Sequence, residues 1–594
     1  MCAEPMALLD SDSSQADFLS SVPILAGLSK DLRAEIASRS RSVEVPAGAW
    51  LFRQGDPGSS LYVVRSGRLE VVAEVPELEV VRVLGRGAVV GELALLMESP
   101  RSASVRVRRD SELLELTRPQ FAELLTTEPE FALALTRELG RELQHSRALT
   151  PPRRPIPAMI TLLAVEPLAL MQEVSRGLLS GMRQFGAVAQ LDDPGEGADA
   201  SDYGPLLDRA ERTHRQILLA AGPPTEGEGW TEFCLRQSDR IVVLASEGEV
   251  PEWIARYPQL SGCDLLLHGA SARQADAARW CEALRPRTTH LLRAGSDFAS
   301  DIRRAARRLA GRAVGVVLSG GGARGFAHIG VLEELLASGI TIDRVGGCSM
   351  GAFVGAMFAM EHDPEAIRAR CREEFVLRSP LNDYTVPFVS LVRGQRARAT
   401  LMRTFGSSTI ETLPRDYFAV TCDLVSGELV VHRQGPLFEA VGASMCLPGL
   451  FAPVPRGDHL LVDGGVLNNL PVQPMAAMAE GPVIAVDVTA QFLPPEARAP
   501  RRRRPRAREW SSRARRVVVG VDTPLPSLKE TLTRAIGIGS VDAVELARRR
   551  ADLLITPETG VVGLLDFEQI DRMVELGRRA AGAAVDATPG FPGD

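Results

Sequence analysis

Short apolar runs separated by glycine turns characterise the first part of the chain. Between about residues 18 and 116, stretches such as SLYVVRSGRLEVVAEV and SASVRVRRDSELLEL recur between these turns. Short strands with frequent turns are typical of a small β-roll. Apolar residues at helical spacing follow from Arg118 to about Leu149, and TPPRRPIP then predicts a linker. We therefore expect a first domain over residues 1–150, a β-roll with C-terminal helices.

A longer alternation of strand-like and helix-like segments begins after this linker. Segments such as QILLAAG and DRIVVLAS predict an α/β domain over residues 155–308, and no phosphate-binding loop follows IVVLAS. A third region opens at Ala313 with AVGVVLSGGGARGFAHIGVLEELLASG, which predicts a strand, a glycine-rich loop and a helix. We place a third domain, with α/β/α layers, at residues 312–590. The chain is thus expected to be a multidomain α/β protein.

Length and composition agree with this division. A chain of 594 residues exceeds what one hydrophobic core usually organises. The net charge of −7 argues against a nucleic-acid partner. The eight cysteines are scattered without CxxC pairs or nearby histidines at zinc-finger spacing. This distribution favours reduced thiols in a cytoplasmic protein and gives no indication of a metal site.

Contact with a membrane is expected to be peripheral. The N-terminal sequence MCAEPMALLDSDSS lacks the basic and apolar regions of a signal peptide. No run approaches the roughly 20 apolar residues that span a bilayer. An Arg/Pro-rich insertion occupies residues 496–516. Two interpretations stay open for it, a solvated loop or a segment that contacts acidic lipid headgroups.

A candidate nucleophile lies between a predicted strand and a predicted helix. Gly347-Cys348-Ser349-Met350-Gly351 fits the pattern G-x-S-x-G, follows the strand-like IDRVGG and precedes AFVGAMFAM. A tight turn at this point projects Ser349 outward, and Gly347 and Gly351 allow other backbone to approach it. The N-terminus of the following helix favours negative charge developing at the serine. The pattern therefore predicts acyl transfer to Ser349.

Backbone amides that stabilise a negatively charged intermediate are expected in GGGARG, residues 320–325. Gly320, Gly322 and Gly325 also spell the G-x-G-x-x-G of dinucleotide-binding folds, with Asp343 about twenty residues further on. In such folds the acidic residue ends the second strand, whereas Asp343 precedes the serine turn by a few residues. Two successive glycine-rich turns between strand and helix fit an oxyanion hole and a nucleophile better.

Two candidates remain for the base that takes the proton of Ser349. Asp463 lies in LVDGGVLNNLP, where a strand would deliver the carboxylate into a Gly-Gly turn. The alternative is a triad in which Asp423 orients His459, a residue that we place in a loop. Asp463 is the stronger candidate from its context. Because a carboxylate is a weak base for a hydroxyl, it would need partial desolvation and a preorganised oxyanion hole.

Four motifs together resemble the patatin-like phospholipases. They are GGGARG, GCSMG, ASMCLPGLFAPV and VDGGVLNNLP, in this order over about residues 314–471. That family uses a Ser–Asp dyad, so the resemblance implies Ser349 as nucleophile and Asp463 as base, with no metal or organic cofactor. It also implies supporting roles for the amides of Gly320, Gly321 and Gly322, for Arg324 and Gly325 beside them, and for the structural residues His328, Asn468 and Pro471.

The expected β-roll contains a second group of informative residues. GELALL (residues 91–96) and PRSAS (residues 100–104) supply a carboxylate, backbone amides and a guanidinium, which can bind a ribose hydroxyl and a cyclic phosphate. The two segments resemble the phosphate-binding cassette of cyclic-nucleotide-binding domains. This resemblance implies that Glu92 holds the ribose and Arg101 the phosphate of cAMP or cGMP. Assisting groups would be Ser102 and the backbone at Gly91, Leu93 and Ala94.

The order of the three regions resembles the neuropathy target esterase family. This resemblance implies a serine esterase that hydrolyses phospholipids or lysophospholipids at a membrane surface, with a cyclic nucleotide as an allosteric ligand. One alternative for the β-roll is an interaction module that binds no nucleotide. An alternative for the whole chain is a cyclic-nucleotide sensor or scaffold with a catalytically silent patatin domain. The intact Ser349, Asp463 and glycine loop argue against that second alternative.

Overall fold

The computed structural model of the chain divides into two compact units. One unit comprises Met1–Ser271, Ala278–Arg287 and Leu292–Ala310, and the other comprises Ala272–Ala277, Thr288–Leu291 and Gly311–Asp594. The residues described are 18–20, 22, 25–74, 78–97, 99–135, 157–165, 168–195, 200–224, 229–246, 248–269, 274–385, 390–489, 539–560 and 562–591. Within these ranges no helix is long and apolar enough to cross a membrane. The bounds of the three expected domains remain a prediction.

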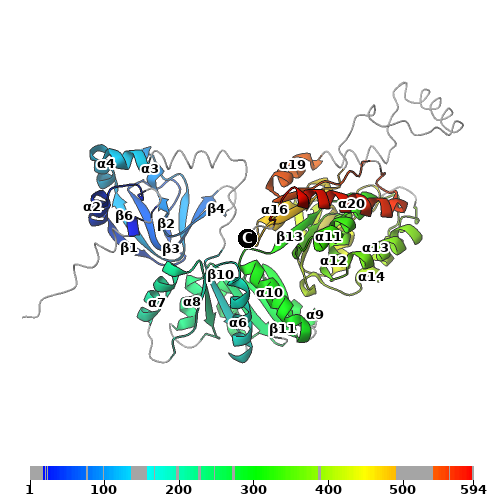
Figure 1. The fold of residues 1–594 in the computed structure, drawn as a ribbon, viewed down its shortest axis with the longest axis horizontal. Helices are drawn as coiled ribbons and strands as arrows, with labels where there is room; N and C mark the ends of the chain where they lie inside the picture. Colours follow the sequence, from blue (N-terminus) through cyan, green and yellow to red (C-terminus); the bar gives the residue numbers. More distant parts are fainter. Residues whose placement is uncertain are drawn as a thin grey trace, which may run out of the picture. The chain divides into compact units, whose positions relative to one another are not determined.

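The first sheet confirms the expected β-roll (Figure 1). Its strand order is β1-β6-β3-β4, with β2 paired to β6 and β5 paired to β3, all antiparallel. Long strand β6 largely alternates buried and partly buried positions, as expected for an antiparallel strand with one face on a core. The elements are α2 (Lys30–Arg39), β1 (Arg41–Val45), β2 (Trp50–Phe52), β3 (Ser60–Glu74), β4 (Leu78–Leu84), β5 (Val89–Val90), α3 (Glu92–Leu96), β6 (Ser104–Thr117) and α4 (Arg118–Thr127). Helical positions 129–135 follow, and the rest of the expected helical run lies outside the described residues.

The second sheet confirms the expected α/β region and has the order β12-β11-β10-β7-β9-β8. Strands β7 and β9 are buried at every position, which suits parallel strands covered on both faces. The elements are β7 (Met159–Ala164), α6 (Leu168–Met182), β8 (Val188–Leu191), α7 (Ala200–Thr213), β9 (Gln216–Ala221), α8 (Trp230–Gln237), β10 (Arg240–Ser246), β11 (Asp264–Gly269), α9 (Gln274–Leu284), β12 (Thr288–Arg293) and α10 (Phe298–Leu309).

The third sheet carries the candidate catalytic residues and has the order β17-β18-β15-β14-β13-β19-β20, with β16 paired to β15. Strands β15, β14, β13, β19 and β20 run parallel, whereas β18 is antiparallel to β15. Its strands are β13 (Val314–Leu318), β14 (Ile342–Gly347), β15 (Asp416–Asp423), β16 (Leu429–His432), β17 (Val454–Arg456), β18 (His459–Asp463), β19 (Val483–Val486) and β20 (Leu553–Ile555). The order brings the serine strand β14 next to β15, and β15 next to the aspartate strand β18.

Helices accompany this third sheet. They are α11 (Ala327–Ala337), α12 (Met350–Ala359), α13 (Pro364–Cys371), α14 (Gln395–Phe405), α15 (Leu437–Ser444), α16 (Val472–Ala476), α19 (Val541–Arg550) and α20 (Ile570–Asp586). Helices α11 and α20 lie side by side (Figure 1). Glycines set their separation, because a Cβ on Gly330 would lie 1.8 Å from the carbonyl oxygen of Val574 and one on Gly577 would lie 1.9 Å from that of Ala327. The two helices therefore touch backbone to backbone.

Candidate functional site

Ser349 occupies a strained turn between β14 and α12, as the G-x-S-x-G pattern predicts. Its φ is 53° and its ψ is −122°, which is unusual for a residue with a side chain. A Cβ on Gly347 would lie 2.5 Å from the carbonyl carbon of Gly351, and a Cβ on Gly351 would lie 2.2 Å from the carbonyl oxygen of Leu318. Both glycines are therefore required by close backbone packing. The serine itself stays partly exposed.

Asp463 ends β18 and lies next to the serine. Its carboxylate is buried and close enough to the Ser349 hydroxyl for that hydroxyl to lower its pKa, and Oδ1 accepts the Gly465 amide at 2.8 Å. Burial raises the pKa of this carboxyl above its usual 3.8, while the hydrogen bonds act in the opposite direction. A carboxylate with a raised pKa is a better proton acceptor. The structure thus brings together the two residues that sequence analysis paired.

The glycine loop after β13 also reaches the serine. A Cβ on Gly320 would lie 3.1 Å from Cβ of Ser349. The Gly320 amide, however, donates to the carbonyl oxygen of Asn469 at 3.2 Å, so it is already engaged. Gly321 and Gly322 are partly exposed, and no acceptor for their amides is found among the described residues. These two amides are the ones available to a negatively charged oxygen.

Asn469 holds this loop and was not singled out in the sequence. Its Nδ2 donates to the carbonyl oxygen of Gly320 at 3.0 Å and to Oγ1 of Thr489 at 3.0 Å. Backbone and side chain of one asparagine therefore fix Gly320 from both sides. The neighbouring Asn468, which the resemblance implied as structural, donates instead to Oε1 of Gln473 at 3.0 Å. The motif NN pointed to the segment, but not to which asparagine contacts the loop.

Two further residues next to the serine escaped the sequence analysis. Cys348 is fully buried, and its Sγ donates to Oδ1 of Asp463 at 3.3 Å. Burial raises the pKa of the thiol well above 9.0, so that it stays a donor. Ser444, the last residue of α15, accepts the Ser349 amide at 3.0 Å and donates to the carbonyl oxygen of Val420 at 2.7 Å. Ser444 thus holds the backbone of Ser349 in place, and Cys348 holds the carboxylate of Asp463.

The Asp423–His459 pair exists but is separate from the dyad. His459 Nδ1 lies 2.9 Å from Oδ2 of Asp423, and this hydrogen bond holds the pKa of that carboxyl well below its usual range. His459 begins β18 rather than lying in a loop, so that expectation was wrong. At about 3.3 Å per residue, the start of this strand lies ~13 Å from Asp463 at its end. The alternative triad therefore lacks a histidine close to the serine.

Other predicted positions take packing roles. His328 is fully buried, and its Nε2 bonds to the carbonyl oxygen of Ser319 at 2.8 Å. Arg324 donates from Nε to the carbonyl oxygen of Val562 at 2.8 Å. A Cβ on Gly325 would lie 2.5 Å from Cγ of Met350, so this glycine brings the loop against the start of α12. Asp343 is buried within β14 and does not end it, unlike the acidic residue of a dinucleotide site.

The β-roll brings the two halves of the expected cassette together. Gly91 has a φ of 91° and caps helix α3, which begins at Glu92. Arg101 is buried, its guanidinium donates to the carbonyl oxygens of Gly91 (3.0 Å) and Ser60 (2.7 Å), and the Glu92 charge lies close enough to influence its pKa. Leu93 and Ser102 are exposed, while Ala94 is buried. The arginine and the amides of α3 thus share one corner of the roll.

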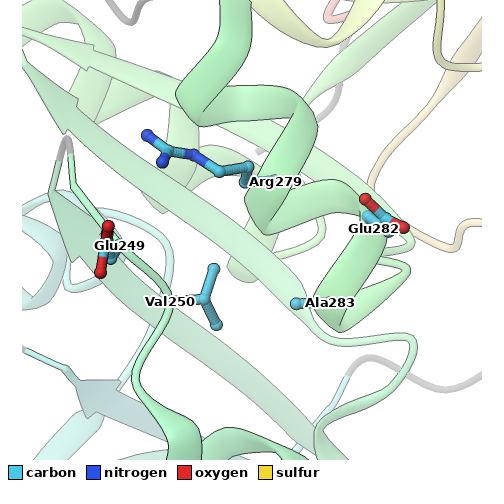
Figure 2. A pocket seen from close by; sticks show the side chains of 5 residues that line it. All are labelled: Glu249, Val250, Arg279, Glu282 and Ala283. Atoms are coloured by element: carbon cyan, nitrogen blue, oxygen red, sulfur yellow. The ribbon is translucent and has the colours of Figure 1, made fainter.

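A hollow beside the second sheet contains none of the residues of the serine site or of the cassette. Its volume is about 470 Å³, and it lies between the segment after β10 and helix α9 (Figure 2). The lining residues are Glu249, Val250, Arg279, Glu282 and Ala283. None is a serine, threonine or cysteine, and all belong to the unit without Ser349. Within the described ranges, no group of three His, Cys, Asp or Glu residues could hold a metal ion.

Comparison with known proteins assigns both sites to families. A family profile described as "Patatin-like phospholipase" matches residues 316–476, and one described as "Cyclic nucleotide-binding domain" matches residues 42–128. A solved structure of the regulatory domain of Toxoplasma gondii PKA with cAMP is 28% identical and covers 22% of this chain and 50% of its own, with a TM-score of 0.21. Because this TM-score is low, we draw no conclusion about function from the structural match.

Relatives extend the likeness to nearly the whole chain. An NTE family protein of Mycobacterium tuberculosis is 36% identical over 587 residues, which is 96% of this chain and 96% of the relative. Patatin-like phospholipase domain-containing protein 6 of Homo sapiens is 30% identical over 75% of this chain and 37% of its own length. The chain belongs to the NTE family and is a lipid carboxylic ester hydrolase with a patatin-like phospholipase domain and a cyclic-nucleotide-binding domain.

Proposed function

We propose that the enzyme hydrolyses acyl esters of phospholipids and lysophospholipids through a Ser349–Asp463 dyad. The observation that carries the proposal is a buried Asp463 carboxylate close enough to the Ser349 hydroxyl for that hydroxyl to lower its pKa, at a strained serine turn. The amides of Gly321 and Gly322 face no other acceptor in the described part of the chain, which suits an oxyanion hole. The likeness to patatin-like phospholipase domain-containing protein 6 supports a phospholipase, and we infer the substrate class from that likeness.

The geometry supports a two-step reaction. Ser349 Oγ attacks the ester carbonyl carbon while its proton passes to Asp463, and the Gly321 and Gly322 amides stabilise the oxyanion. The C–O bond to the glycerol then breaks, and the departing oxygen takes the proton from Asp463. Water, deprotonated by Asp463, then attacks the acyl carbon. The bond from that carbon to Ser349 Oγ breaks, Oγ takes the proton back from Asp463, and the fatty acid leaves.

The dyad is tested by single and double substitution. Because Ser349 and Asp463 act as one unit, Ser349→Ala and Asp463→Asn should each lower turnover by at least about 1,000-fold, with little further loss in the double variant. A fluorophosphonate should label the native protein at Ser349 alone. His459→Ala is the matched control and should retain most of its activity. A folded His459→Ala protein as inactive as Asp463→Asn would replace the dyad with a triad.

A screen of lysophospholipids, phospholipids, triacylglycerols and short p-nitrophenyl esters tests the substrate class. Preference for the first two would support the proposal. Activity limited to the short esters would contradict it. A protein inactive on all of them despite an intact fold would favour the alternative, a sensor with a silent patatin domain.

We further propose that the β-roll binds cAMP or cGMP and regulates the esterase. The support is the shared corner formed by buried Arg101 and the N-terminus of α3, together with the match to a cyclic-nucleotide-binding domain. Glu92 would accept a hydrogen bond from the ribose and Arg101 would neutralise the phosphate. We also propose that the protein is cytoplasmic and contacts the membrane surface peripherally. The Arg/Pro-rich insertion at 496–516 lies outside the described residues.

A further inference from the structure

Helix α14 presents an exposed face that carries arginines and no carboxylate. At about 100° per residue, its exposed positions spread over about 160° of the helix circumference, and the buried Thr400 and Phe405 lie outside this arc. The exposed residues of the helix are Gln395, Arg396, Arg398, Met402 and Arg403. Arg393 precedes the helix and is also exposed. Neither Arg393 nor Arg396 has an acidic partner among the residues that the structure describes, and Arg398 lies over the Phe438 ring at 5.4 Å.

Large apolar side chains flank these arginines. Leu377 is 75% exposed, Tyr384 is 70% exposed and Met402 is 43% exposed. The segment that precedes α14 holds Tyr384 near the start of the helix, because Asp383 Oδ2 accepts the Arg396 amide at 3.1 Å. Exposed leucine and methionine beside unpaired arginine is the composition of a surface that enters the headgroup region of a bilayer.

A buried carboxylate links helix α14 to the turn that carries Leu377. Glu374 is fully buried in the π-helical turn Arg372–Leu377, just before Leu377. Its carboxylate accepts Thr400 Oγ1 at 2.9 Å and Arg403 Nε at 3.0 Å, both from α14. One buried carboxylate therefore joins the turn that carries Leu377 to the helix that carries Met402.

The same face adjoins the serine site. The amides of Leu391 and Val392 donate to the carbonyl oxygens of Gly449 (3.1 Å) and Leu450 (3.0 Å), in the loop whose Cys446 carbonyl accepts the Asp463 amide at 2.9 Å. Helix α14 also packs on α15, which ends at Ser444, the residue that accepts the Ser349 amide. One layer of structure thus separates the exposed arginines from the dyad.

We propose that this face, formed by residues 377–384 and 393–403 and here called the α14 face, docks on an anionic lipid surface and delivers substrate to Ser349. The inference rests on the proposed lipid esterase activity and adds the surface through which the enzyme reaches its substrate. Arginines pair with phosphate and carboxylate headgroups while the apolar side chains enter the acyl boundary. Within the two ranges that define the face, the one carboxylate is that of the half-buried Asp383, which accepts the Arg396 amide.

Vesicle sedimentation in the Ser349→Ala background tests the α14 face without hydrolysing the lipid. The vesicles are phosphatidylcholine alone, or equal parts phosphatidylcholine and phosphatidylserine. The triple variant R393Q/R396Q/R398Q should bind the anionic vesicles on the order of 100-fold more weakly. The pair Leu377→Ser and Met402→Ser should weaken binding to both kinds of vesicle. The matched control, R549Q/R572Q/R579Q on α19 and α20, removes the same charge from exposed positions and should bind like the parent.

Circular dichroism and thermal unfolding of each variant show whether it is folded. Equal binding by the arginine variant and the control would overturn the proposal. So would dimers of the parent, seen by sedimentation, that the α14 variants abolish, because the face would then join two copies of the chain. The native enzyme is assayed separately on a short-chain lysophospholipid below its micelle concentration. Turnover there, with vesicle binding indifferent to the α14 face, would remove this inference and leave the esterase proposal standing.

Discussion

At the scale of single residues, Asp463 experiences two opposing influences. Burial raises the pKa of its carboxyl, and hydrogen bonds from Ser349, Gly465 and Cys348 lower it. Catalysis needs the carboxylate form, so activity should be lost as the pH falls through that pKa. The acid limb of the pH profile should therefore lie above pH 3.8, the usual value for an aspartate.

Substituting Cys348 should shift the acid limb of the pH–activity profile. Cys348→Ala removes one hydrogen bond to the carboxylate, which should raise the pKa of Asp463 and shift the acid limb of kcat/KM to higher pH. Cys348→Ser keeps a donor and should lie closer to the native profile. The measurement is kcat/KM on a water-soluble ester across the acid range. A thiol that merely fills space would leave the limb in place in both variants.

The buried His328 should make the protein less stable at acidic pH. Burial lowers its pKa from 6.5 to about 4, so the native state keeps it neutral while the unfolded chain takes up a proton below about pH 6.5. Its contribution is complete above that pH and is lost as the pH falls towards 4, by about 3 kcal/mol. In His328→Gln, which keeps a donor for Ser319, the free energy of unfolding should decline less between pH 7 and pH 4. Parallel declines in denaturant titrations would contradict this assignment.

At the scale of elements, the contact between α11 and α20 depends on missing side chains. Gly577→Ala would place a Cβ 1.9 Å from a backbone oxygen, whereas Gly582→Ala, on the same helix, meets nothing closer than 3.6 Å. The first substitution should therefore lower the free energy of unfolding by about 3 kcal/mol or more. The second should leave it unchanged or raise it by up to about 1 kcal/mol, because alanine favours the helix. Thermal or urea unfolding of both proteins compares them directly.

Much of the element order is legible in the sequence, because local patterns determine it. The strand, glycine loop and helix after Ala313 appear as β13, the short turn Gly322–Phe326 and α11. The serine turn lies where G-x-S-x-G puts it. His459 was misplaced in a loop because RGD suggests a turn, whereas pairing of β18 with β15 and β17 extends the strand to it.

The side-chain contacts that position the site residues could not be predicted from the sequence. Asn469 meets Gly320 across 149 positions, and Cys348 meets Asp463 across 115. No periodicity or motif encodes such pairings, which depend on the order of strands in the sheet. For the same reason, sequence alone offered three glycine amides for the oxyanion, and only the structure revealed that Asn469 occupies the first.

At the scale of the whole molecule, the proposed regulation links a ligand in the β-roll to an esterase in the other unit. Arg101→Ala should weaken cyclic-nucleotide binding by about 100-fold, or ~3 kcal/mol, because a buried charge loses its partner. Arg101→Lys keeps the charge without the bidentate geometry, so its nucleotide affinity should lie between those of the native protein and Arg101→Ala. Arg106→Ala, which lies in β6 and outside the cassette, is the control. Calorimetry on the full chain gives the affinities.

Regulation requires that the nucleotide bind the active and inactive arrangements with different affinity. Native turnover should therefore change when the nucleotide is added, in either direction, and Arg101→Ala should not respond. Binding without any change in turnover would leave the cassette intact and remove its regulatory role. No heat with either nucleotide up to millimolar concentration would reduce the β-roll to an interaction module.

The route by which Ser349 and Asp463 meet has a consequence for how activity appears during synthesis and refolding. The serine comes from the end of β14, but the aspartate arrives only after β15 has formed and β18 has turned back against it. Contacts between residues so distant in the chain form slowly, because a long loop must close first. A chain with its early strands and helices in place therefore still lacks its base. Esterase activity should accordingly appear late in refolding, after the strand that carries the aspartate has joined the sheet.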